Sequence, residues 1–417
     1  MNSFTRLPIH FIFALIFLPF AFSACRDDED EVVIPPVQTL ACSYTTNTTL
    51  LEAVYEVNCD VIVSNATLNI PAGAKLVFKS GTKISTSNGG AINAVGTSVK
   101  PIVFTGKEAI KGYWKGVDIN TNSLNNTFSH CRFEYGGSGQ SMVRLGGDNS
   151  EICKAVFTSC IFDGSAVNGL FVNEQSSIAG STANQFKNNN EYAVWMAYEN
   201  VSELDNSNQF SNNVKNKVYV KSDDFTINEL VVFNKISVPY VLDNTPSNPL
   251  KKIVAGFEIK PGTVIEMSPN FMLEVQSSGY FKAQGTAAEP IIIRGIEPVK
   301  GYWDKIRFKA TPSASNIMQY CIISDGGNYY DNAWFDKGMV TTRKDLSSTP
   351  RLQITDCTFK NSLNYAIDLY QCAASGAMLV NGQEGALAIK AALESANQFP
   401  SPLAADANNA GNVRTTE

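Results

Sequence analysis

The sequence predicts an all-β fold: a single-stranded, right-handed parallel β-helix in which two tandem duplicated halves are stacked in one continuous helix. Three observations support this prediction. A long segment occurs twice at a constant offset, phenylalanines recur every 23–29 residues in short apolar runs, and glycine or asparagine follows these runs. Strand-and-corner units that repeat at this length are typical of solenoids, whose coils bury a continuous core only when they are stacked.

The duplication is visible in four pairs of matching segments. They are Ile70–Gly73 with Ile259–Gly262, Gly96–Thr97 with Gly285–Thr286, Pro101–Gly106 with Pro290–Gly295, and Lys111–Trp114 with Lys300–Trp303. Every pair is offset by 189 residues, as from Ile70 to Ile259. A constant offset over such a length does not arise by chance. We therefore expect a first half at residues 41–235 and a second half at residues 236–417.

A shorter period marks the individual coils. The phenylalanines that define it are Phe78, Phe104, Phe133, Phe162, Phe186, Phe210 and Phe233. The residues that follow them are Gly106, Gly136, Gly164, Asn188, Asn212 and Asn234, which tolerate the left-handed backbone of a sharp corner. Because neighbouring coils lie about 4.8 Å apart, we expect a phenylalanine ladder inside and a ladder of corner residues at the bend. Parallel crossovers are right-handed, which sets the hand of the helix.

Four of the nine cysteines fit the same repeat. Cys131 and Cys160 each lie two residues before a ladder phenylalanine, and Cys321 and Cys357 are their counterparts in the second copy. We expect these four to be stacked in the core as small buried hydrophobic side chains, rather than bonded or reactive thiols. The chain has no C-x-x-C motif, which argues against zinc or thioredoxin-like chemistry.

The N-terminus has the features of an exported protein. Arg6 precedes an apolar run from Ile9 to Phe22, which is shorter than the roughly 20 residues of a membrane-spanning helix and leads into small residues. Residues 1–24 are therefore expected to be a signal peptide. The sequence Ser23-Ala24-Cys25 resembles the lipobox of bacterial lipoproteins, which implies that Cys25 is the lipidated first residue of the mature chain. The alternative is an ordinary secretory signal followed by an incidental cysteine.

Residues 25–40 are expected to form a tether. An acidic run from Asp27 to Glu31 is followed by Val-Val-Ile-Pro-Pro, a composition that cannot fold on itself. The acidic run resembles the surface-export signals of Bacteroidetes lipoproteins, and a solvated spacer is the alternative. We thus expect the protein to be lipid-anchored at the outer membrane or cell surface. Disulfides persist in such a compartment, and Cys42 and Cys59 are a candidate pair.

Composition excludes several functions. The formal net charge is −6 and no clustered basic surface is evident, so a nucleic-acid partner is not expected. No second apolar run approaches spanning length, which leaves the lipid as the expected membrane attachment. His130 is the only histidine after the signal peptide, which excludes histidine-dependent triads and zinc sites built from several histidines. No metal site or catalytic residue is predicted.

Three segments carry a resemblance to a known family. Leu68–Phe78, Pro101–Gly106 and Gly112–Ile119 resemble the right-handed parallel β-helix proteins common among Bacteroidetes surface lipoproteins. The resemblance covers roughly residues 60 to 400 and implies a fold shared with pectate-lyase-like enzymes, but no activity, since one superfold hosts many functions. A lyase of this fold would need carboxylates for calcium and an Arg or Lys base. Arg144 and Arg343 lie at like positions of the two copies, yet no catalytic motif maps onto them.

An insertion in the second copy is the main departure from the repeat. Eleven residues separate Gly327 from Met339, where four separate Gly137 from Met142. Insertions in solenoids project as loops, often on the binding face. The candidate ligand-binding residues are Asp325, Tyr329, Tyr330, Asp331, Trp334, Phe335 and Asp336. Rigid aromatics beside carboxylates suit sugar hydroxyls. They suit calcium less well, because the Asp spacing does not match a calcium loop. A self-packed flap is the alternative.

Three functions are compatible with these predictions. The first is a non-catalytic binding or scaffold module for glycan or protein at the cell surface. The second is a polysaccharide lyase or glycoside hydrolase acting in a lateral groove. The third is a purely structural envelope protein. We favour the first because no catalytic set is identifiable in the sequence.

Overall fold

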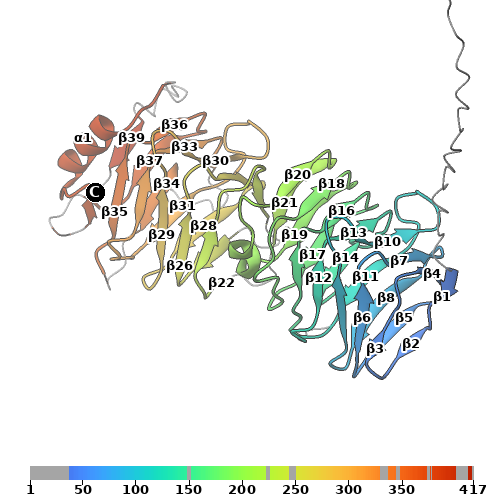
Figure 1. Cartoon of the computed structure of the whole chain (residues 1–417). Helices are drawn as coiled ribbons and strands as arrows, with labels where there is room; N and C mark the ends of the chain where they lie inside the picture. Colours follow the sequence, from blue (N-terminus) through green and yellow to red (C-terminus); the bar gives the residue numbers. More distant parts are fainter. Residues whose placement is uncertain are drawn as a thin grey trace, which may run out of the picture. The chain divides into compact units, whose positions relative to one another are not determined.

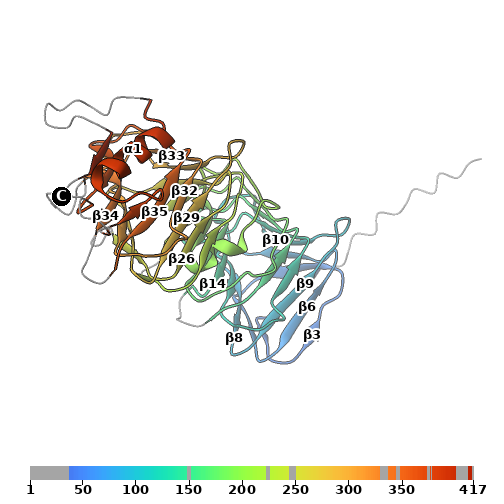
Figure 2. The ribbon, with the colours of Figure 1, turned by 90° about the vertical axis from the view of Figure 1, so that its left-hand side faces the viewer.

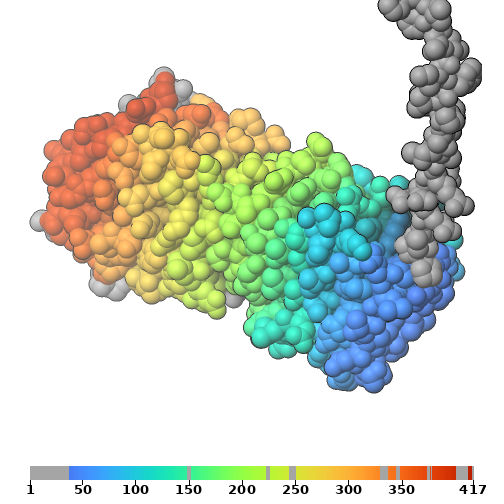
Figure 3. All heavy atoms as spheres, in the orientation of Figure 1, coloured from blue at the N-terminus to red at the C-terminus, as the bar shows by residue number. Residues whose placement is uncertain are grey.

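The protein is a right-handed parallel β-helix, whose coils follow one another in sequence order (Figures 1 and 3). The computed structural model describes residues 37–147, 152–221, 226–243, 250–328, 337–343, 348–372, 376, 378–400 and 412–415. These residues belong to one compact unit. Its β structure begins at Val37, slightly before the expected start at residue 41.

Five parallel sheets make up the described coils. The 8-stranded sheet contains β1 (Val37–Thr39), β4 (Val54–Val57), β7 (Lys75–Phe78), β10 (Ile102–Gly106), β13 (Cys131–Glu134), β16 (Ile161–Asp163), β18 (Gln185–Lys187) and β20 (Gln209–Ser211). The 5-stranded sheet contains β3 (Thr48–Thr49), β6 (Thr67–Pro71), β9 (Ala91–Val95), β12 (Thr127–Ser129) and β15 (Val156–Thr158). The 13-stranded sheet contains β2 (Ser43–Tyr44), β5 (Val61–Ser64), β8 (Lys83–Ser87), β11 (Gly116–Ile119), β14 (Val143–Leu145), β17 (Leu170–Val172), β19 (Tyr192–Met196), β21 (Lys215–Val220), β24 (Tyr240–Leu242), β27 (Val264–Met267), β30 (Ile291–Gly295), β33 (Cys321–Ser324) and β36 (Thr358–Lys360).

The other two sheets begin at the end of the first copy and continue through the second copy. The 7-stranded sheet contains β22 (Thr226–Ile227), β25 (Leu250–Ile253), β28 (Met272–Val275), β31 (Ile306–Lys309), β34 (Gly338–Arg343), β37 (Tyr365–Leu369) and β39 (Val413–Thr415). The 6-stranded sheet contains β23 (Val231–Phe233), β26 (Gly256–Ile259), β29 (Tyr280–Gln284), β32 (Ile317–Gln319), β35 (Arg351–Thr355) and β38 (Leu379–Val380). A 3₁₀ helix, η1 (Tyr198–Glu203), and an α-helix, α1 (Ala386–Ala396), complete the described elements.

The two copies are joined through one continuous sheet but are shifted by one face. Strand β7 of the 8-stranded sheet corresponds, at the offset of 189 residues, to β27 of the 13-stranded sheet. In the same way β8 of the 13-stranded sheet corresponds to β28 of the 7-stranded sheet. The 13-stranded sheet therefore runs through both copies. The strands that the second copy contributes to it correspond to strands of the 8-stranded sheet in the first copy.

The phenylalanine ladder is confirmed for five of its seven members. Phe104, Phe133, Phe162, Phe186 and Phe210 are paired in successive strands, with neighbouring ring centroids 5.0, 5.2, 4.7 and 5.4 Å apart. These rings fill the inside of the first copy.

The prediction was wrong for the two outer members of the ladder. Phe78 lies opposite Gly106, two positions out of register, and stacks on Trp114 at 4.0 Å. Phe233 belongs to the 6-stranded sheet, where it contacts Phe257. Sequence spacing counts loop residues as well as strand residues, so it indicates a period without fixing the register of each strand.

The corner after these strands uses the left-handed backbone, with a partly different set of residues from the expected one. Gly164, Asn188 and Asn212 have φ of 75°, 57° and 54°, as predicted. Gly106, Gly136 and Asn234 are not left-handed, so the prediction was wrong for them. Tyr135 takes the corner one residue before Gly136, with φ 61°.

The stacked cysteines are buried free thiols, as expected. Cys160 donates from Sγ to the carbonyl of Phe128 at 3.3 Å. In the next coil the same position holds Asn184, whose side-chain amide donates to the carbonyl of Phe157 at 2.9 Å. The thiol and the amide thus donate to equivalent backbone carbonyls in successive coils.

The second copy repeats this arrangement. Cys321 and Cys357 donate to backbone carbonyls at 3.3 and 3.4 Å, and Asn397 takes the position after them. Burial raises the pKa of Cys131 and of Cys321 well above that of a free thiol. These cysteines are therefore structural groups that remain protonated and unreactive.

The tryptophans of the duplicated Gly-Tyr-Trp segments are packing residues. Trp114 and Trp303 are fully buried. Their indole N–H groups donate to the carbonyls of Glu134 and Ser324 at 2.8 and 2.7 Å. Each tryptophan thus ties the loop before its strand to the strand of the next coil.

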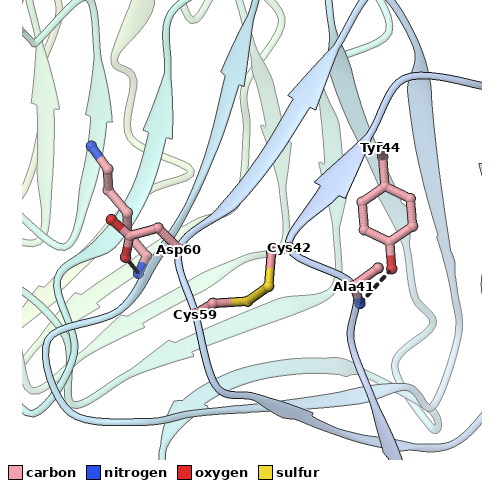
Figure 4. The surroundings of a disulfide bond; sticks show 6 residues. Ala41, Cys42, Tyr44, Cys59 and Asp60 are labelled. Atoms are coloured by element: carbon pink, nitrogen blue, oxygen red, sulfur yellow. Dashed lines mark hydrogen bonds between the residues drawn. A yellow bond between two sulfur atoms is a disulfide. The ribbon is translucent and has the colours of Figure 1, made fainter.

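At the N-terminal coil Cys42 and Cys59 form a disulfide, the pair expected from the sequence (Figure 4). Their Cα atoms are 5.8 Å apart and 17 residues separate them in sequence. Beside them the backbone N–H of Ala41 donates to the Tyr44 hydroxyl at 3.3 Å. The disulfide links the first described coil to the second, because Cys42 precedes β2 and Cys59 precedes β5, its neighbour in the sheet.

Candidate functional site

A row of side chains on the outer face of the 13-stranded sheet is the candidate site. Its members are Asp118, Arg144, Phe171, Trp195, Tyr219, Val241, Glu266 and Arg294, and each is paired with the next across neighbouring strands. We call them the lateral row. Its first five members lie on β11, β14, β17, β19 and β21, which are side by side in Figure 1.

The lateral row faces outward because of strand alternation. The residues before and after each aromatic member are buried in the core, for example Leu170 and Val172 around Phe171. Successive side chains of a strand point to opposite faces, so Phe171, Trp195 and Tyr219 point away from the core. All three are partly exposed. Large aromatic side chains on this face are not required to fill the helix.

The three aromatics stack on one another. The ring centroids of Phe171 and Trp195 are 4.5 Å apart, and those of Trp195 and Tyr219 are 5.8 Å apart. Tyr192 adds a fourth ring at 4.7 Å from Tyr219 and lies under the Lys215 ammonium at 4.9 Å. Stacking covers the ring faces within the row, so the row presents mainly ring edges to a partner.

A charged cluster lies at one end of the aromatics. The carboxylate of Asp118, only 2% exposed, accepts from Lys83 at 2.8 Å and from the Gln140 amide at 3.1 Å. Arg144 donates to Oε1 of the Gln140 side chain and lies over the Phe171 ring at 6.0 Å. The Gln140 side chain therefore links the buried carboxylate to the arginine that flanks the aromatics.

A second charged cluster lies at the other end. Glu266, whose side chain is 4% exposed, pairs with Arg294 at 2.7 Å and with Lys217 at 2.6 Å. The Tyr219 hydroxyl donates to Asp243. Burial, together with this hydrogen bond and the Asp243 charge, raises the pKa of Tyr219, so the phenol stays protonated. The aromatics are thus held between two groups of paired charges.

The lateral row does not have the geometry of a catalytic carboxylate pair. Asp118 and Glu266 are six strand pairings apart, which is about 29 Å at the spacing of neighbouring strands. Pairs of carboxylates that act on a glycosidic bond lie about 5–10 Å apart. Each of the two is also paired with a cation. Stacked rings and fixed charges of this kind can bind a partner, but they offer no acid and base.

A row of buried charges occupies the 7-stranded sheet. Glu274, Arg307, Thr341, Asp368 and Arg414 are paired in that order across its strands. Arg307 donates to Glu274 at 2.9 Å, and Arg414 binds Asp368. The two carboxylates are three strand pairings apart, about 14 Å. Both are bound to arginines, so this row is a set of structural ion pairs.

The equivalence of Arg144 and Arg343 expected from the sequence was wrong. Arg144 is paired with Asp118, and Asp118 corresponds to Arg307 of the second copy at the offset of 189 residues. The residue paired with Arg307 is Thr341, so Thr341 is the counterpart of Arg144. Arg343 lies two residues further along β34, opposite Lys309. Aligning the two segments by residue type concealed a shift of two positions.

Asp325 is a buried corner residue. It is 5% exposed and has φ 71°. One carboxylate oxygen accepts from the Asn361 amide at 2.6 Å, and the other accepts from the Ser324 hydroxyl at 2.8 Å and from the Gly295 N–H at 3.3 Å. Both oxygens are used within the protein, so Asp325 holds the corner and is not placed to contact a ligand.

The other six candidates of the insertion, Tyr329, Tyr330, Asp331, Trp334, Phe335 and Asp336, lie outside the described residues, as does Cys25. The two ends of the insertion are described. The Asn328 amide donates to the Asn270 side chain at 2.8 Å, and the Lys337 N–H donates to Asp368 at 2.6 Å. The insertion therefore leaves the coil beside the start of β28 and returns at the buried charges of the 7-stranded sheet.

The aromatic members of the lateral row were not predicted from the sequence, although a signal was present. Phe171, Trp195 and Tyr219 are 24 residues apart, and each stands between two aliphatic or methionine residues. An aromatic in the middle of an inward-outward-inward triplet has to point outward. The period of the ladder was defined by phenylalanine alone, so this second period was missed.

Two negative findings apply to the residues that the structure describes. They contain no group of three or more His, Cys, Asp or Glu residues that could hold a metal ion. Among the same residues, no helix combines the length and apolar character needed to cross a membrane.

Comparison with known proteins supports the fold. A family model described as a pectate-lyase-like β-helix domain matches residues 42–154, which is less than half of the chain. No curated protein and no solved structure matches. The match lies in the first copy and ends before Phe171, so it covers only the Asp118 and Arg144 end of the lateral row.

Proposed function

We propose that this chain is a lipid-anchored surface protein whose β-helix is a non-catalytic module for binding glycan or protein. The observation that carries the proposal is the lateral row. Its stacked, outward-facing aromatics lie between arginines and paired charges, and aromatic and arginine side chains are enriched at recognition surfaces.

The structure of the row suits binding at low entropic cost. Phe171, Trp195 and Tyr219 are held by each other, and Arg144 is held through Gln140. Side chains that are already ordered lose little freedom when a partner arrives. Because the ring faces cover one another, the row favours a flat partner that lies along the row, across the strands, over a sugar ring inserted between two aromatics.

The anchor and the tether complete the proposal. An acylated Cys25, followed by the acidic and proline-containing segment, would place the β-helix at the outer membrane surface. A lipid chain with a tether leaves the lateral faces of a solenoid accessible to extracellular partners. This arrangement is suited to a surface receptor or scaffold.

The test is a glycan array and a panel of purified surface proteins, probed with the soluble protein from Val37 onward. The Trp195→Ala and Tyr219→Ala variants should lose binding to at least one partner that the parent protein retains. Ile322→Ala is the matched control, since Ile322 is a partly exposed apolar residue of the same sheet outside the row. Full binding by both row variants would refute the row as the site. Release of unsaturated sugars in a lyase assay run alongside would show that the protein is a catalyst and would contradict the proposal of a non-catalytic module.

A further inference from the structure

A hollow occurs at the same place in both copies of the duplication. The hollow of the second copy has a volume of about 390 Å³ and lies against β32, β35 and β38 of the 6-stranded sheet. The hollow of the first copy has a volume of about 190 Å³ and lies against β15 and the chain that pairs with it. Strands β29, β32 and β35 are side by side in Figure 2. Ligand pockets have volumes of about 300–1,000 Å³, a range that only the second hollow reaches.

The two hollows share the same supporting hydrogen bonds. In the first copy the Asn126 amide donates to Thr121 Oγ1 at 3.0 Å and to the Lys154 carbonyl at 3.1 Å. In the second copy the Asn316 amide donates to Thr311 Oγ1 and to the Arg351 carbonyl, both at 3.0 Å. The scaffold beneath the hollows is therefore duplicated, and differences between the linings are differences at matched positions.

The lining of the second hollow is wider and more polar. Leu124 of the first copy is replaced by Ala314, and Val156 is replaced by Gln353, which occupies the same place in the strand pairing. The smaller side chain at residue 314 is consistent with the larger volume. The change to glutamine adds a donor and an acceptor at its wall.

The second hollow also has the more favourable charge for an anion. Arg351 replaces Lys154 at its rim and makes no ion pair within the described part of the chain. Described carboxylates are absent from the linings of both hollows. In the first hollow, however, Ser177 donates to the carboxylate of Glu203 at 2.5 Å. A planar guanidinium can bind the two oxygens of an oxyanion at once, which an ammonium cannot do.

A buried hydroxyl in the second hollow lacks a partner. Thr355 Oγ1 is inaccessible to solvent and makes no hydrogen bond among the described residues. Thr355 lines the hollow together with Gln353. Because Oγ1 is inaccessible from the hollow, this hydroxyl does not contact a ligand there, and Thr355 contributes only to the wall.

From these observations we infer that the second hollow is a binding site for a sugar ring that carries a sulfate or carboxylate group. Arg351 binds the oxyanion, and Gln353 binds a ring hydroxyl. The first hollow is the narrower counterpart, too small to hold the ring. The site lies on a different sheet from the lateral row, and its occupation does not depend on that row.

The experiment measures binding of matched oligosaccharides to the mature protein by calorimetry. Three versions of one oligosaccharide are compared: sulfated, carboxylated and neutral. Arg351→Gln should weaken binding of a charged version about tenfold or more, because a charge-assisted hydrogen bond is lost. Gln353→Ala should weaken it by a smaller factor. The sulfated and carboxylated arms identify the oxyanion, and the neutral version should not bind.

Two control variants distinguish the second hollow from the first hollow and from the lateral row. Lys154→Gln changes the matched cation of the first hollow and should leave binding unchanged. Trp195→Ala disables the lateral row and should also leave it unchanged, so failure of the proposed function and failure of this site are distinguishable. Equal binding by Arg351→Gln and the parent, equal losses in Arg351→Gln and Lys154→Gln, or no binding of either charged sugar would each overturn the inference. Unchanged circular dichroism of the variants shows that they fold.

Discussion

Replacing Phe162 by alanine tests the inner ladder and its register. Phe162 is fully buried, stacks on Phe133 at 5.2 Å and on Phe186 at 4.7 Å, and meets the edge of Phe157 at 5.5 Å. Phe→Ala in a core costs about 3–5 kcal/mol, and each aromatic pair contributes roughly 0.5–1.5 kcal/mol beyond burial. With three ring neighbours, Phe162→Ala should lie at the upper end, about 4–5 kcal/mol.

Two further alanine variants calibrate this value. Phe210 is 8% exposed and stacks on one ring only, at 5.4 Å, so Phe210→Ala should cost about 3 kcal/mol. Phe171 points outward, and Phe171→Ala should cost about 1 kcal/mol. The assay is urea unfolding followed by circular dichroism, with hydrogen exchange of the coils around each site, because solenoids can unfold in parts. A loss for Phe171→Ala as large as that for Phe162→Ala would refute the assigned register.

Three further outcomes are expected. Cys25→Ser should move the protein from the membrane fraction to the soluble fraction, because the acyl chains are its proposed attachment; unchanged fractionation would contradict this. Cys160→Asn should change the free energy of unfolding by only about 1 kcal/mol, since Asn184 occupies the same place in the next coil. Cys160→Asp, in which the new side chain has nearly the same size as asparagine, should cost about 3–5 kcal/mol because it buries an unpaired charge. Equal costs of the two variants in urea unfolding would disprove the shared role of cysteine and asparagine. Burial raises the pKa of Tyr198, Tyr219 and Tyr240 above the unfolded value of about 10. Their contribution to stability is therefore complete below pH about 10 and is lost as pH rises further, and a melting temperature that stays constant from pH about 9 to about 11.5 would argue against it.

The repeat predicted the fold class because it reports on a physical necessity. Each coil must bury an apolar strand and turn a corner, so Phe104 to Phe210 and the corner residues Gly164, Asn188 and Asn212 recur in step. The ends of the ladder could not be predicted in this way. Phe78 lies two positions out of register and stacks on Trp114, which belongs to the loop after β10 in the next coil. That contact depends on how a loop folds back, which strand spacing does not encode.

The candidate site was harder to predict than the fold. The insertion was a candidate because of its composition, and Asp325 was included because it lies near the insertion in sequence. In the structure its carboxylate is occupied by Asn361, Ser324 and Gly295, partners distributed over three coils. Such partners become visible only when the coils are stacked. The lateral row depends equally on stacking, because Phe171, Trp195 and Tyr219 are ordinary strand residues until their coils are placed side by side.

The shift of one face between the copies decides what the duplication means for function. Had the copies been stacked in line, equivalent surfaces would face the same way, and one long ligand could engage both in the same manner. Instead the 13-stranded sheet combines one face of the first copy with a different face of the second. The lateral row therefore runs from Asp118 on β11 to Arg294 on β30, two strands that do not correspond in the duplication. Each surface along this sheet is therefore a composite that neither copy contains alone. The hollows, in contrast, each lie within one copy, and the second has Ala314 and Gln353 where the first has Leu124 and Val156.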